Sequence, residues 1–167
     1  DARIAAIYEG TNGIQAADLV GRKLAMRGGG VISDLLDEFE LRVKELASID
    51  GLTLFAQRLD EAIATTRVAT AHLIEIGPTD GRSLLGASSP YLRLLGTTVC
   101  AGLVAKGAVA ASTEANARAA FNADFLAAKT ASARFFGEQI LPTTAGLLAA
   151  ITAPADDLFA LTADQLL

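Results

Sequence analysis

Residues 52–76 read LTLFAQRLDEAIATTRVATAHLIEI, and this stretch predicts one long amphipathic helix. Apolar and small residues recur in it every three or four positions, as they do on the buried face of a helix. They are Phe55, Leu59, Ala62, Ile63, Thr66, Ala69, Leu73 and Ile76. Gly77-Pro78 ends the pattern, because proline has no amide hydrogen to donate and its ring clashes inside a helix. Such a helix needs other helices to cover its apolar face.

The same spacing predicts three more long helices, at 33–49, 91–111 and 114–139. Residues 91–111 are apolar nearly all round, which is typical of a helix surrounded by others. Ser112-Thr-Glu114 offers a start signal for the last helix. No alternating strand pattern is present, and alanine is frequent enough to favour close approach of helices. The sequence therefore predicts an all-α fold, an antiparallel helix bundle.

The segments between and after these helices contain turn-forming residues. Residues 77–90 are dense in glycine, proline, serine and aspartate and predict the longest connection, with Pro90 in the first turn of the next helix. A shorter helix is expected at 142–152, followed by a turn of helix and a tail from Leu158 to Leu167.

We expect the bundle to be preceded by a helix-turn-helix segment that bears the YEGT motif at residues 8–11. Ile14, Ala17, Val20 and Leu24 recur at helical spacing and predict a helix over 12–27, with Thr11 or Asn12 as its N-cap. Gly28-Gly-Gly30 has no side chains to pack and predicts a flexible joint. We therefore expect the motif segment at 1–27, a linker at 28–30 and the bundle at 31–167.

Composition excludes several classes of function. The formal net charge of −5 and pI near 4.8 leave no electrostatic footprint for nucleic acid. Arg22, Lys23 and Arg27 form the one local basic cluster, and their place at a predicted helix end gives them a structural role; a CoA phosphate contact is the alternative. Cys100 is the single cysteine and lies in an apolar run, so we expect a small buried side chain, no internal disulfide and a reducing, cytoplasmic compartment.

The longest weakly charged interval runs from Leu94 to Thr113. It contains Lys106 and is rich in glycine and alanine, whereas a spanning helix needs about 20 mostly apolar residues. We expect a buried helix and no membrane span. Asp1 begins in mid-pattern without a leader-like start, so we expect this chain to be a piece of a longer one.

Residues 8–15 read YEGTNGIQ, and this octapeptide carries the clearest chemical signal. Gly10 and Gly13 permit backbone conformations that a Cβ would obstruct, so Glu9 can occupy a tight turn that a ligand approaches closely. Beside Ile7 and Tyr8, burial would raise the pKa of Glu9 and make its carboxylate a better base. For a glutamate next to a glycine turn in general, a solvent-exposed helix end is the ordinary alternative.

The segment from Asp1 to Leu24, with IYEGTNGIQ followed by DLVGRKL in helical register, resembles the C-terminal part of the acyl-CoA dehydrogenases. The resemblance implies that Glu9 is the catalytic base and that its backbone NH helps polarise the thioester carbonyl. It also implies that Tyr8 and Gly10 line the acyl-CoA pocket. Thr11, Asn12 and Gly13 would lie beside FAD, although many members have Ser-Gln at the last two positions, so only a backbone contact carries over there.

A weaker resemblance covers the rest of the chain. YLRLLG at 91–96 and ARFF at 133–136 are similar to the branch with an extra C-terminal helical domain, which includes the 3-methylmercaptopropionyl-CoA dehydrogenases. The resemblance implies an FAD-dependent oxidation of acyl-CoA to trans-2-enoyl-CoA, an electron-transfer flavoprotein as acceptor and a homo-oligomer. The isolated chain is expected to be inactive. The alternative is a helical scaffold or oligomerisation module without catalysis.

The remaining candidates give weaker signals. His72 is the single histidine and has no second ligand at metal spacing, so we predict a partly buried or surface side chain and no metal site. A hydrolase triad has no Gly-x-Ser-x-Gly turn, and Gly28-Gly-Gly30 lacks the Lys-Ser/Thr of a phosphate loop. The phenylalanine stripe is expected to pack in the core; its members are Phe121, Phe125, Phe135 and Phe136.

Overall fold

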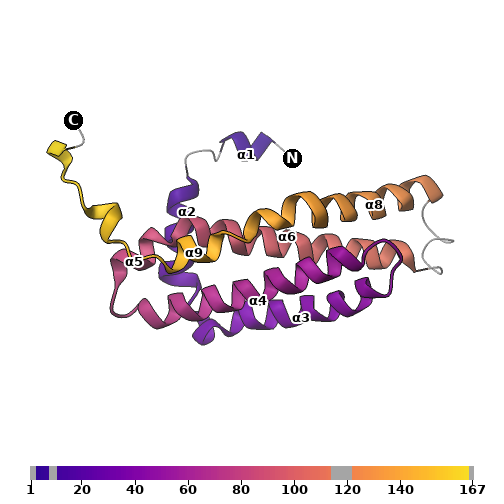
Figure 1. Cartoon of the computed structure of the whole chain (residues 1–167), viewed down its shortest axis with the longest axis horizontal. Helices are drawn as coiled ribbons and strands as arrows, with labels where there is room; N and C mark the ends of the chain where they lie inside the picture. Colours follow the sequence, from indigo (N-terminus) through magenta and orange to yellow (C-terminus); the bar gives the residue numbers. More distant parts are fainter. Residues whose placement is uncertain (1–2, 8–10, 114–121, 166–167) are drawn as a thin grey trace.

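The computed structural model describes residues 3–7, 11–113 and 122–165 (Figure 1). Within these ranges all regular structure is helical and no strand is present, so the all-α prediction is confirmed for them. The α-helices are α1 (Arg3–Ile7), α2 (Asn12–Asp18), α3 (Gly30–Ala47), α4 (Thr53–Ile76), α5 (Gly81–Gly86), α6 (Ser88–Ser112), α8 (Ala123–Phe135) and α9 (Leu147–Thr152). The π and 3-10 segments are η1 (Leu19–Lys23), η2 (Met26–Gly29), η3 (Phe136–Ile140), η4 (Leu141–Thr144), η5 (Asp156–Phe159) and η6 (Ala163–Gln165).

Helices α3, α4, α6 and α8 lie side by side, and successive ones run in opposite directions (Figure 1). Helix α3 packs on α4, both contact α6, and α6 also contacts α8. The long helices at 33–49, 52–76 and 91–111 were therefore predicted to within a few residues of their ends. Their apolar stripes provide the core, as amphipathic spacing requires.

Small residues let these helices approach closely. A methyl group at Gly102 would collide with the ring of Phe39, and one at Gly137 would lie 2.6 Å from atoms of Phe55. Both phenylalanines are 1% exposed, so the two glycines leave the space that the rings fill. Buried alanines complete the contact, as the alanine content predicted; they are Ala62, Ala69, Ala101, Ala105, Ala108 and Ala133.

Two pairs of buried hydroxyl groups link α4 and α6 in the interior. The Oγ1 atoms of Thr66 and Thr98 are 3.0 Å apart, and Thr70 Oγ1 lies 2.8 Å from Tyr91 Oη. Each threonine hydroxyl also lies within bonding distance of a carbonyl one turn earlier in its own helix. These polar groups are therefore satisfied inside the core, which avoids the cost of burying them unpaired.

The connection predicted at 77–90 is wrong in its middle, because it contains a helix. Asp80 is the N-cap of α5 and accepts a hydrogen bond of 2.9 Å from Ser83 N. Helix α6 then begins at Ser88, so Pro90 does lie in its first turn. An aspartate three residues before the capped amide is a helix-start signal that the abundance of turn formers obscured.

The predicted helix at 114–139 is also corrected. Residues 114–121 lie outside the described residues, Ser112 ends α6, and α8 begins after Asn122, whose Oδ1 accepts from Phe125 N at 2.7 Å. Helix α8 passes into the π segment η3, and the helix expected at 142–152 is split into η4 and α9. Pro142 is compatible with the first turn of η4, and the break falls later, at Ala145 and Gly146 between η4 and α9.

The helix predicted at 12–27 ends as an α-helix at Asp18. Leu24 N then donates to Leu19 O at 2.8 Å, the wider bond of a π turn, and both Val20 and Leu24 are buried. Arg27, Gly28 and Gly29 have φ of 52°, 64° and 86°. At Gly29 a methyl group would lie 2.5 Å from Ile74 Cδ1, so the turn needs glycine there for both its backbone and its packing on α4. The domain boundary at 28–30 stays a prediction.

The composition of α6 predicted a helix surrounded by others. Among the described residues, however, one side of α6 is exposed. Cys100 is exposed rather than buried, and Leu103 is 56% exposed. Phe125 and Phe135 are exposed, so the predicted aromatic core stripe is wrong for them. Phe136 is partly buried and packs against the core, as predicted. Among the described helices α6 alone is long and apolar enough to cross a membrane by length and composition. It packs on α3, α4 and α8 along its other side.

Candidate active-site segment

The motif predicted to hold the reaction is only partly within the described residues. Tyr8, Glu9 and Gly10 lie outside them, so the predicted base and the predicted acyl-CoA contacts stay predictions. The flanking helices are described: α1 ends at Ile7 and α2 begins at Asn12. A helix is therefore present on each side of the motif, as the helix-turn-helix prediction requires.

The predicted cofactor-binding residues lie at the start of α2. Thr11 O accepts from Gln15 N at 2.9 Å, which fixes the first turn, and Asn12 and Gly13 are exposed. Gly13 lies within the helix, outside the left-handed region, and a methyl group there would meet nothing within 4 Å. The conformational reason predicted for Gly13 is therefore wrong. Close approach of a ligand stays the remaining explanation for a glycine at this site.

An ion-pair cluster fixes the end of α2. Asp18 accepts from Arg22 Nε at 2.8 Å and from Lys23 Nζ at 2.9 Å. Hydrogen bonds from these two cations lower the pKa of the Asp18 carboxyl. Arg27 pairs at 2.9 Å with Asp34, in the second turn of α3. The basic cluster thus stabilises the path of the chain from α2 to α3, which agrees with its predicted structural role.

Apolar side chains on the same segment point away from the core. Ile4 is 60% exposed, Ile7 74% and Ile14 71%. Figure 1 shows α1 standing apart from the bundle, on the side of α6 and α8. We call Ile4, Ile7 and Ile14 the N-terminal isoleucines. Isoleucine is among the residues most often found buried, and three in eleven residues form an exposed apolar surface.

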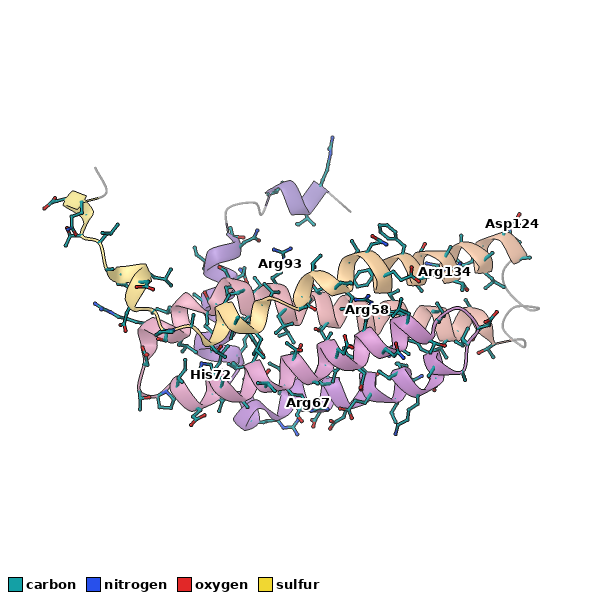
Figure 2. The ribbon with its side chains drawn as sticks, in the orientation of Figure 1. Arg58, Arg67, His72, Arg93, Asp124 and Arg134 are labelled. Carbon is teal, nitrogen blue, oxygen red and sulfur yellow. The ribbon has the colours of Figure 1, made fainter. Side chains whose placement is uncertain are left out.

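A cleft lies next to the glycine turn. It has a volume of about 380 Å³ and is lined by α3, α4 and residues 27–30. Arg67 projects toward α3, where Asp37, Glu40 and Ser33 accept its guanidinium hydrogen bonds (Figure 2). Burial works to lower the pKa of Arg67, but these carboxylates outweigh it and raise the pKa. The cleft's cations are thus already paired, and sequence reasoning missed this network because its partners are thirty residues apart.

The described residues hold no cluster of metal ligands. His72 is partly buried on α4, as predicted, and no group of three His, Cys, Asp or Glu side chains converges within the ranges that the structure covers (Figure 2). The motif segment between α1 and α2 therefore stays the candidate site that the sequence predicts.

Comparison with known proteins decides the family. The profile of the acetyl-CoA dehydrogenase C-terminal-like family matches residues 35–162, which covers most of the bundle. The chain belongs to this family. It is also 35% identical over 159 residues to the 3-methylmercaptopropionyl-CoA dehydrogenase of Ruegeria pomeroyi, a match that covers 95% of this chain.

The same match covers only 27% of the relative's length, so this family member spans about a quarter of that protein. The resemblance inferred from YEGTNGIQ is thus confirmed at the level of the family. The family profile begins at Leu35, after the motif, and so describes the bundle rather than the predicted catalytic turn.

Proposed function

We propose that this chain is the C-terminal part of an FAD-dependent acyl-CoA dehydrogenase that converts acyl-CoA to trans-2-enoyl-CoA. The observation that carries the proposal is the 35% identity to a dehydrogenase of a CoA thioester over nearly the whole chain. The octapeptide at 8–15, which reads YEGTNGIQ, also supports it, because it contains a carboxylate next to a glycine that allows a ligand to approach closely.

In this proposal Glu9 removes the α-proton of the bound thioester. A base for this step needs a pKa near the working pH, and an apolar enclosure raises the pKa of a carboxyl in that direction. Tyr8 and Gly10 would line the acyl-CoA pocket, and the backbone of Thr11, Asn12 and Gly13 would lie against the cofactor. FAD, held against this backbone, would supply the acceptor for the β-hydride, and an electron-transfer flavoprotein would take up the electrons.

The parent enzyme is proposed to be a homo-oligomer of the reducing cytoplasm. The family resemblance implies that most of its flavin site and substrate pocket lie outside this chain, which matches 27% of the relative's length. The 167-residue chain by itself is therefore expected to be inactive. Formation of enoyl-CoA by this chain with added FAD would contradict that expectation.

The test uses the full-length gene product that contains this chain. Its flavin absorbance is followed anaerobically after addition of a panel of acyl-CoAs that includes 3-methylmercaptopropionyl-CoA. Rapid bleaching is expected in the natural protein, and Glu9→Gln should slow it by about 10² to 10⁴-fold, the usual contribution of a general base. The matched control is Glu75→Gln on the exposed surface of α4, which should bleach at the natural rate.

A second function is favoured by one observation. The family profile matches residues 35–162, and most of the buried core lies in that range, which suits a scaffold or oligomerisation module. The bleaching test separates the two, because a scaffold without catalysis binds no flavin. Bound flavin that no acyl-CoA bleaches would contradict both.

A further inference from the structure

Helix α6 has a buried side and an unpartnered side. We call Gly96, Cys100, Leu103 and Gly107 the outer face of α6; their spacing of four, three and four places them on one line of the helix. Gly96 is partly buried, whereas the other three are exposed. The opposite line carries Tyr91, Leu94 and Thr98, which are 0% exposed.

The glycines of α6 distinguish the two sides. Glycine inside a helix costs about 1 kcal/mol relative to alanine. At Gly102 the ring of Phe39 explains this cost, since a methyl group would collide with it. At Gly96 and Gly107 a methyl group would meet nothing within 4 Å. No described residue therefore requires these two positions to be small.

The outer face is also uncharged. Between Arg93 and Ser112 the one charged residue is Lys106, and its Nζ lies 2.6 Å from Glu38 Oε1 on α3. A groove of about 260 Å³ runs beside the face, lined by Leu103, Val104, Gly107, Ala108, Lys129 and Ser132. Apart from Lys129, whose Nζ lies over the ring of Phe125, the groove is lined by apolar and small side chains, against which an apolar side chain of a partner can pack.

The N-terminal segment adjoins this face. Helix α2 packs on α6, with Ala16 fully buried. Arg93 projects from α6 toward the side on which α1 stands (Figure 2). Helix α1, which carries Ile4 and Ile7, thus stands on the side of α6 toward which Arg93 projects, one turn before Gly96 (Figure 2). The N-terminal isoleucines and most of the outer face of α6 are exposed in the described residues. About three quarters of the relative's length lies outside this match, which is ample chain to cover them.

We propose that the dehydrogenase body of the parent enzyme packs over the outer face of α6 and the N-terminal isoleucines together. This inference rests on the proposed function, because the body is the part of the enzyme that would hold the Glu9 turn. The contact of α2 with α6 is then the visible beginning of a larger interface. Gly96 and Gly107 let a partner helix approach α6 as closely as Gly102 lets Phe39 approach it.

The thiol of Cys100 measures this contact directly, because it lies in the outer face and is exposed in this chain. The rate of its alkylation by N-ethylmaleimide is followed by peptide mass spectrometry, in the 167-residue chain and in the flavin-loaded full-length protein. Cys100 is expected to react at least about tenfold more slowly in the full-length protein, since it must wait for local opening. The control is Val68→Cys on the exposed surface of α4, expected to react equally in both.

The outcomes separate this inference from the proposed function. Equal Cys100 rates in the two proteins, with flavin bound and acyl-CoA oxidised, would overturn the inference and leave the function standing. Protection of Cys100 without flavin would support the covered face and count against the dehydrogenase. Protection in the 167-residue chain that grows with its concentration would assign the face to a second copy. Protection by phosphatidylcholine and phosphatidylglycerol vesicles would assign it to a membrane, and either result overturns the proposal.

Discussion

Large apolar side chains are buried in the bundle but exposed in α1 and at Ile14 of α2. In α3, α4 and α6 the large apolar side chains meet one another, and Leu36, Phe39 and Leu59 are at most 1% exposed. In α1 and α2 the N-terminal isoleucines are 60% to 74% exposed. Burial of an apolar side chain is worth about 1.5 to 3 kcal/mol, so the three isoleucines contribute little to stability in this chain. Val20 and Leu24, later in the motif segment, do join the core.

This difference indicates which helices are stabilised by contacts within this chain and which are not. A region with its own core keeps its shape by internal contacts, whereas a short helix of five residues such as α1 is marginal without tertiary contacts. The helices that flank the predicted catalytic motif therefore contain the large apolar residues that are least buried within this chain. Replacing apolar residues in the two regions tests the contrast directly.

The largest effect is expected from Phe39→Ala in α3. The ring is 1% exposed and fills the space beside Gly102, so its loss should lower the free energy of unfolding by about 3 to 5 kcal/mol. Ile14→Ala in α2 is the paired variant, with an expected change within about 0.5 kcal/mol. Urea unfolding of the 167-residue chain measures both. Similar losses in the two variants would show that α2 shares the bundle's core.

A smaller pair of opposite changes is expected from two glycines of α6. Gly102→Ala places a methyl group against Phe39 and should lower the free energy of unfolding by about 1 to 3 kcal/mol. Gly107→Ala meets no neighbour and should raise it by about 0.5 to 1 kcal/mol through helix propensity. Thermal unfolding followed by circular dichroism gives the sign of each. Destabilisation by Gly107→Ala would mean that its side of α6 is already covered in this chain.

Periodicity found the bundle because its information is local. The stripe in residues 52–76 predicted α4 nearly to the residue, since each turn of that helix contributes to one buried face. Periodicity failed at α6, where composition could not say which side faces a neighbour. Cys100 and Leu103 are as apolar as Tyr91 and Leu94, yet only the second pair lies toward α4 and the core.

The candidate site was found by a motif rather than by physics. Spacing alone predicts a turn at Glu9, and the family resemblance implies its role as the base. The pKa of a carboxyl depends on the side chains around it, which no local sequence pattern specifies. The ion pairs of Arg67 with α3 were missed because pairs between helices depend on how helices are aligned, which no local pattern specifies. Asp80 carried a capping signal in the sequence and was overlooked among turn formers.

A smaller effect than that of Gly102→Ala is expected from Tyr91→Phe, which tests whether water reaches the buried side of α6. Tyr91 is fully buried, and burial raises the pKa of its hydroxyl, against a weaker opposing effect of the hydrogen bond with Thr70. Because the folded pKa lies above the unfolded one, the associated stability is complete below about pH 10 and is lost as pH rises through the folded pKa. Tyr91→Phe should cost about 1 kcal/mol at pH 7, the value of the lost hydrogen bond.

Above about pH 10 the natural chain should lose stability faster than Tyr91→Phe, so the difference between them should narrow. Urea unfolding of both proteins at pH 7 and at alkaline pH measures this difference, and every other titrating group cancels in the comparison. An unchanged difference would show that water reaches the Tyr91 hydroxyl from the outer side of α6. The buried and exposed lines of that helix would then be less distinct than the packing of Phe39 on Gly102 indicates.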